Sequence, residues 1–173
     1  MYRARQFFRA LGARIESATW AEVKALLTPA QMTLFRQMPR YDQRHSLNVV
    51  RTLRAAGYDH PDLLIAALLH DVAKSAGPLR LWHRVAIVLL EAFAPRWLNW
   101  LAREVESRHW RYPFYVHHLH PEIGARWAEK AGCSSLTVWL IAHHQSLADQ
   151  DANPLENSRG RLLSALRWAD EQN

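Results

Sequence analysis

The sequence has a single cysteine and no long uncharged apolar run, and each shortage excludes a class of protein. Cys133 is the only cysteine among 173 residues, which excludes a disulfide framework and a cysteine-based zinc site. This usage is typical of a reducing compartment, so we expect a cytoplasmic protein. The most apolar stretch, residues 81–102, carries Arg84, Glu91 and Arg96. It lacks the roughly 20 uncharged residues that a membrane span needs, and we expect a helix there that is buried or faces a partner.

Basic residues exceed acidic ones without forming a block. The chain has 22 Lys and Arg against 16 Asp and Glu, a formal charge of +6, and no run of five or more basic residues. A surface of this kind attracts anions. It fits a substrate that carries phosphate, or simply a solvated basic exterior, and we do not expect a nucleic-acid partner.

The chain is predicted to be a series of helices. No alternating apolar and polar pattern of useful length predicts a strand, and no internal repeat or long linker divides the chain. We expect an all-α, single-domain helical bundle. Within it we expect an N-terminal helical extension over 1–39, a core over 40–173 and a Trp-rich helical insertion at about 81–115. Disorder is expected only around Gln145–Glu156.

Proline, glycine and capping residues predict where the helices begin and end. Helix starts are expected at a Thr19–Glu22 capping box, Thr28-Pro29, Pro61, Pro121, Ser134 or Ser135, and near Pro154. Helix ends are expected at Gly57 and Gly132, and further breaks near Pro95 and Pro113.

Histidines and aspartates lie at the edges of the apolar segments. His70-Asp71 follows the apolar run Leu63–Leu69. Burying such a pair without compensation costs several kcal/mol, so either the helix reaches the surface there or a metal ion compensates. His45 lies on an amphipathic helix, and the other candidates are His120 at a helix start, His143-His144 at a helix end and Asp170 at the end of the last helix. A helix bundle can direct such side chains at one site, and imidazole with carboxylate suits Fe, Mn, Co, Ni or Zn.

Five ordered motifs resemble the HD superfamily of metal-dependent phosphohydrolases. They are Arg44-His45-Ser46-Leu47, Leu69-His70-Asp71-Val72-Ala73-Lys74, His120-Pro121-Glu122-Ile123-Gly124, Ile141-Ala142-His143-His144 and Ala169-Asp170, spanning about residues 40–173. The resemblance implies a helical bundle of the HD type with two divalent ions, Fe or Mn favoured, with Zn, Co, Ni or Mg as alternatives. It implies a first ion held by His45, His70, Asp71 and Asp170, with Asp71 bridging to a second ion.

The resemblance assigns the second ion to His120 and one histidine of the adjacent pair. Neighbouring helix residues point about 100° apart, so His143 and His144 are not expected to bind the same ion. The spacing from Ile141 favours His144, with His143 as the alternate. His117 and His118 could replace His120 if the chain turns differently, although the His120–Gly124 motif favours His120.

The resemblance also implies hydrolysis of a phosphoester or phosphoanhydride in a nucleotide or another small phosphorylated substrate. Lys74 would meet the substrate phosphate, and Asp71 and Lys74 would be the catalytic residues. The ligand order is similar to that of the diadenosine tetraphosphate hydrolase branch. The branch that hydrolyses cyclic di-GMP carries an Asp-Gly-x-Gly-Tyr-Pro run that this chain lacks. A non-catalytic nucleotide sensor and a di-iron oxygenase are the alternatives, and a homodimer is left open.

Overall fold

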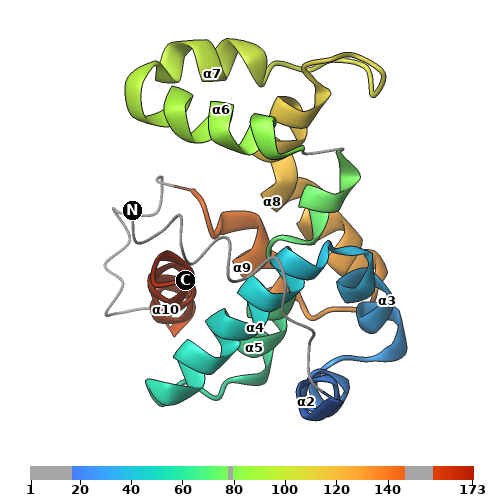
Figure 1. The fold of residues 1–173 in the computed structure, drawn as a ribbon. Helices are drawn as coiled ribbons and strands as arrows, with labels where there is room; N and C mark the ends of the chain where they lie inside the picture. Colours follow the sequence, from blue (N-terminus) through green and yellow to red (C-terminus); the bar gives the residue numbers. More distant parts are fainter. Residues whose placement is uncertain (1–16, 78–79, 147–157) are drawn as a thin grey trace.

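The computed structural model describes residues 17–77, 80–146 and 158–173, and the regular structure in these ranges is helical (Figure 1). This described part of the chain contains nine α-helices, one short 3-10 helix and no strand. The bounds are α2 Ser17–Leu26, α3 Pro29–Gln37, α4 Arg40–Ala55, α5 Pro61–Leu69, η1 Val72–Ala76, α6 Leu81–Phe93, α7 Pro95–Leu101, α8 Tyr112–Lys130, α9 Ser135–His143 and α10 Ser158–Glu171. The all-α prediction is confirmed.

Several helices begin and end where the sequence predicts. The Thr28 side chain accepts the amide of Gln31, whose side chain accepts the Thr28 amide in return, so a capping box begins α3. Ser134 caps α9 by accepting the Thr137 amide. After α4 and α8 the chain reverses at glycines, with φ of 84° at Gly57 and 76° at Gly132. Other residues rarely adopt this left-handed conformation.

Two predicted boundaries are wrong. α2 begins before Thr19, so Thr19 is inside a helix, and Glu22 pairs instead with Arg54 of α4 at 2.5 Å. The break predicted near Pro113 is confirmed, because α8 begins at Tyr112 and places Pro113 in its first turn, where a missing N–H costs little. Pro121 lies inside the same helix and does not begin it. The bundle therefore tolerates a proline where local preference predicts a break.

Helices α4, α5, α8, α9 and α10 surround one apolar core. Its fully buried side chains include Leu53, Leu63, Leu68, Leu140, Ile141, Leu163 and Leu166. α2 and α3 add Val23 and Phe35 to the same core, and the division of the chain at residue 39 stays a prediction. Residues 1–16 of the predicted extension, most of the predicted disorder at 145–156, and the predicted start near Pro154 lie outside the described residues.

Helices α6 and α7 form a hairpin that projects from the bundle (Figure 1). α6 ends at Phe93 and α7 begins at Pro95, which confirms the predicted break. The hairpin packs against α8. Many of its apolar side chains, including Val88 and Trp97, are exposed, so the alternative of a buried helix over 81–102 is wrong. None of the described helices is both long enough and apolar enough to cross a membrane.

Candidate metal centre

All six side chains predicted to bind metal lie together, although they come from distant parts of the chain. They are His45 of α4, His70 just after α5, Asp71 just before η1, His120 of α8, His144 just after α9, and Asp170 of α10. The Asp71 carboxylate lies at the centre, because each of its two oxygens faces a different set of histidines. Groups of these side chains could hold a metal ion.

One oxygen of Asp71 faces the outer trio, which we define as His45, His70 and Asp170. Asp71 Oδ2 lies 3.5 Å from His70 Nε2 and 3.9 Å from His45 Nε2. Asp170 Oδ1 completes this group, at 2.8 Å from His45 Nε2 and 3.5 Å from His70 Nε2. Four side chains thus direct nitrogen or oxygen atoms at one small volume.

The other oxygen of Asp71 faces the inner pair, which we define as His120 and His144. Asp71 Oδ1 lies 3.3 Å from His120 Nε2 and 3.9 Å from His144 Nε2, and the two nitrogens are 3.3 Å apart. Burial, together with His70 and His120, lowers the pKa of His144 to about 3. His144 is therefore neutral at ordinary pH, which is the form that binds metals.

The alternate histidines take other positions. His143 directs its Nδ1 at the carbonyl of Trp139, 2.8 Å away, and its ring stacks on the Trp139 ring at 4.6 Å between centroids. His118 is exposed. The ring of His117 lies tilted against that of His120 at 5.8 Å, and burial and the nearby Lys74 lower the pKa of His117 to about 3. Only His144 of its pair and His120 of its cluster are in contact distance of Asp71.

The backbone orients three of the imidazole rings in the same way. His70, His120 and His144 each direct Nδ1 at the carbonyl three residues earlier, namely that of Ala67, His117 and Ile141, at 3.0, 2.5 and 2.8 Å. In an uninterrupted helix such a carbonyl would accept the amide of the residue that follows the histidine. For His70 and His144 that residue lies beyond the helix end. For His120 it is Pro121, which has no N–H. The Nδ1 proton is thereby fixed, and Nε2 is directed at the cluster with a lone pair.

The donor atoms fit a metal ion. His70 Nε2 and Asp71 Oδ1 are buried and have no hydrogen-bond partner among the described residues. Since His120 and His144 both direct Nδ1 at a carbonyl, their Nε2 lone pairs face each other and repel unless a proton or cation lies between them. Ligand atoms bound to one ion at about 2.1 Å lie about 3.0–3.4 Å apart in octahedral or tetrahedral shells. The separations around Asp71 run from 3.3 to 3.9 Å, and the shorter of them are close to that range.

The two carboxylates give the cluster a charge that favours cations. Burial would raise the pKa of Asp71, but Lys74 and His70 hold it well below its usual value. Burial also opposes ionisation of Asp170, but the hydrogen bond with His45 and the charge of nearby His70 lower its pKa. Burial would lower the pKa of His70, but Asp71 and Asp170 raise it to about 9. Without a metal, His70 therefore holds a second proton, on Nε2, near neutral pH, and a bound cation would displace this proton while satisfying the same carboxylates.

Lys74 stands beside the cluster on its solvent-facing side. Its Nζ lies 2.7 Å from Asp71 Oδ2. Burial opposes its charge, but Asp71 raises its pKa, so it stays an ammonium. His45, Lys74 and Asp170 are partly exposed, whereas the inner pair is buried. A ligand entering from solvent would meet His45, Asp170 and Lys74 first.

Sequence reasoning missed Arg167, which joins the end of α9 to α10. Its guanidinium donates to the carbonyls of His143 at 2.7 Å, His144 at 3.2 Å and Ser146. His143 and His144 lie at the end of α9, where carbonyls lack helical amide donors, although the His143 carbonyl also accepts the Ser146 amide at 3.0 Å. Arg167 thus fixes the backbone that carries His144. No sequence pattern pointed to it, because its role depends on how α9 and α10 pack.

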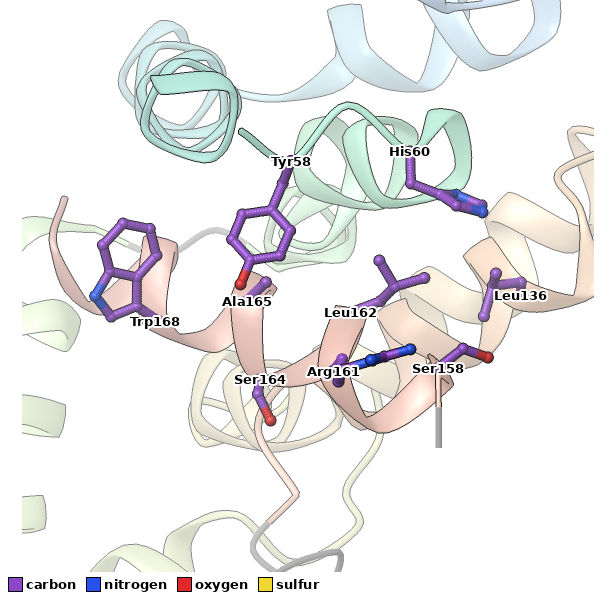
Figure 2. A pocket seen from close by; sticks show the side chains of 9 residues that line it. All are labelled: Tyr58, His60, Leu136, Ser158, Arg161, Leu162, Ser164, Ala165 and Trp168. Carbon is purple, nitrogen blue, oxygen red and sulfur yellow. The ribbon is translucent and has the colours of Figure 1, made fainter. Parts of the chain in front are cut away.

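A separate pocket of about 760 Å³ lies between the α4–α5 turn, the start of α9 and α10 (Figure 2). Figure 2 shows Tyr58 directed toward α10, and Arg161 and Trp168 are among the α10 side chains that line the pocket. None of the six predicted metal ligands lines it. Asp170 lies nine residues after Arg161, about half a turn further around α10. The pocket and the cluster are therefore on opposite sides of that helix.

A scan against protein-family models and searches of curated proteins and of solved structures gave no match to this chain. The HD superfamily therefore stays a prediction from the sequence motifs. Any function has to be argued from the geometry around Asp71.

Proposed function

We propose that the chain is a metal-dependent phosphohydrolase of the HD type, acting on a small phosphorylated substrate such as a nucleotide. The observation that carries the proposal is the position of Asp71 between the outer trio and the inner pair, with Lys74 at 2.7 Å. Two bound divalent ions, Fe or Mn favoured, would supply Lewis-acid charge and a more acidic water for attack on phosphorus.

The chain's own residues would have separate roles in binding the two ions. His45, His70 and Asp170 would hold one ion and His120 and His144 the other, while Asp71 would serve both through its separate oxygens. The buried histidines exclude solvent from the inner side. Their Nδ1 bonds to backbone carbonyls keep Nε2 in place without rearrangement during turnover.

Lys74 would bind the phosphoryl group. Its ammonium lies on the partly exposed side of the cluster and keeps its proton, because the neighbouring Asp71 raises its pKa. Negative charge that develops on a phosphoryl oxygen there would meet a preformed positive charge. The net basic charge of +6 also favours encounter with an anionic substrate.

The test begins with metal content and then asks where oxygen in the product comes from. Chelated protein is reloaded anaerobically with Fe²⁺ or Mn²⁺, and bound metal is counted by elemental analysis. We expect close to two ions per chain for the wild type and for Asp59→Asn, an exposed control, and loss of both ions for Asp71→Asn. Loaded protein is then screened on nucleotides and bis-p-nitrophenyl phosphate in ¹⁸O-labelled water without O₂.

Hydrolysis predicts one labelled oxygen in the phosphate product under these anaerobic conditions. Turnover that requires O₂ would contradict the proposal in favour of an oxygenase. Binding of a nucleotide by the loaded protein with no turnover would favour a sensor. Protein that takes up no metal would refute the assignment of the centre itself.

A further inference from the structure

The hairpin of α6 and α7 presents apolar side chains to solvent along its outer face. On α6, Trp82, Val85, Leu89 and Phe93 follow one another at three- and four-residue spacing, and all are exposed. Phe93, at the tip, is 83% exposed, and Trp97 of α7 is 65% exposed. A surface helix normally turns polar residues outward. Here the described outward positions of α6 are apolar.

The opposite side of α6 carries the contacts that hold the hairpin on the bundle. Ile87 and His83 are buried, and the His83 ring lies 5.6 Å from that of Phe114 in α8. Trp82 shares in this contact, since its ring lies 6.3 Å from that of Phe114, whereas Val85, Leu89 and Phe93 are exposed along the other side. Because the hairpin projects from the bundle (Figure 1), its tip can insert into a binding partner or a lipid layer without any movement of the core. Contiguous exposed apolar surface of this kind marks an interaction site.

The segment that forms the hairpin and the loop after it is rich in arginine. Residues 80–111 contain six arginines, three glutamates and neither lysine nor aspartate. Arg96, Arg103 and Arg108 are exposed. Arg111 lies over the Trp100 ring at 4.8 Å and donates to the Trp100 carbonyl at 3.0 Å. Tryptophan and arginine beside an aliphatic and phenylalanine surface is the composition of segments that lie at a membrane–water interface.

We propose that the outer face of α6 and α7 docks on an anionic lipid bilayer, with Phe93 and its apolar neighbours among the acyl chains and the arginines at the phosphate headgroups. Charge complementarity favours an anionic bilayer over a second copy of the chain. A second copy seated on the same face would bring together two segments that each carry more arginines than glutamates, and like charges oppose such an interface. Anionic headgroups instead attract the arginines. The proposal is independent of the metal centre.

The test uses the full chain in a flotation assay with two kinds of vesicle, phosphatidylcholine alone and phosphatidylcholine mixed with phosphatidylglycerol. We expect binding to the mixed vesicles, weakened by salt. Phe93→Glu should lower partitioning about tenfold or more, since it removes a large apolar group that would be buried among the acyl chains. Arg96→Gln should lower it about fivefold. Tyr58→Glu is the matched control, because it places the same charge at an exposed aromatic residue far from the hairpin.

Several outcomes would overturn the proposal. The wild type could fail to bind the mixed vesicles, or bind neutral ones equally well. Tyr58→Glu could weaken binding as much as Phe93→Glu does. Sedimentation could reveal a dimer that Phe93→Glu dissociates while no vesicle is bound, which would assign the face to a second copy.

Discussion

Replacing Pro121 by alanine should raise the free energy of unfolding and lower the affinity of the inner pair for metal. A proline inside a helix costs about 3 kcal/mol relative to alanine, because it removes an amide and its ring crowds the preceding turn. The missing amide leaves the His117 carbonyl to the Nδ1 proton of His120, 2.5 Å away. Alanine would restore the helical hydrogen bond and share that carbonyl between two donors.

The two effects have opposite signs, which makes the prediction specific. Pro121 is buried, so lost packing offsets part of the gain, and we expect the free energy of unfolding to rise by about 1–2 kcal/mol. A ring hydrogen bond is worth about 1 kcal/mol net. Loosening it should weaken the affinity of the His120 side for metal about fivefold to tenfold.

The assay separates the two quantities. Urea unfolding is measured on chelated protein, so that bound metal does not add to stability, and metal affinity is measured by calorimetric titration. Pro113→Ala is the matched control, because Pro113 lies in the first turn of the same helix, where no amide is needed. It should leave metal affinity unchanged. If Pro121→Ala gains stability while the affinity stays at the wild-type value, the proline does not orient His120.

Three further predictions concern single side chains. Lys74→Ala should keep both ions in elemental analysis, because it removes a competing cation from Asp71. In steady-state kinetics it should lower kcat for any phosphoester substrate. His144→Gln should weaken one of the two ions about 100-fold or more, whereas His143→Gln should retain both; equal losses in titration would contradict this. Ser134→Ala should lower the free energy of unfolding by about 1 kcal/mol in urea, through loss of the α9 cap.

The sequence predicted those parts of the fold that depend on local chemistry. Thr28 and Ser134 begin helices because their hydroxyls satisfy free amides, and Gly57 and Gly132 end them because they adopt positive φ. Pro121 was misinterpreted because its local cost is offset by tertiary structure, which local rules do not contain. The sequence places His120 next to Pro121, but it does not tell that the His120 ring is directed at the His117 carbonyl.

The candidate site was predictable as a set of residues and less so as a geometry. Motif spacing proposed all six side chains that meet around Asp71, and the distances agree with two groups sharing one carboxylate. Arg167 was not predictable, since its three carbonyl acceptors lie at and just beyond the end of another helix, α9. The sequence also does not decide whether α6 and α7 are exposed. An apolar helix can be buried or face a partner, and only its packing against other helices decides between the two.

The contact between His45 and Asp170 joins residues 125 positions apart. An ion held by both would act as a cross-link between α4 and α10, in a chain whose single cysteine leaves it without an internal disulfide. Closing a loop of 100 residues restricts the unfolded chain by about 4.7 kcal/mol in the entropic account. Removal of the ion by a chelator would release α10 from α4. Hydrogen exchange should then accelerate first in α10, while α5, whose Leu63–Leu69 run lies in the core, stays protected.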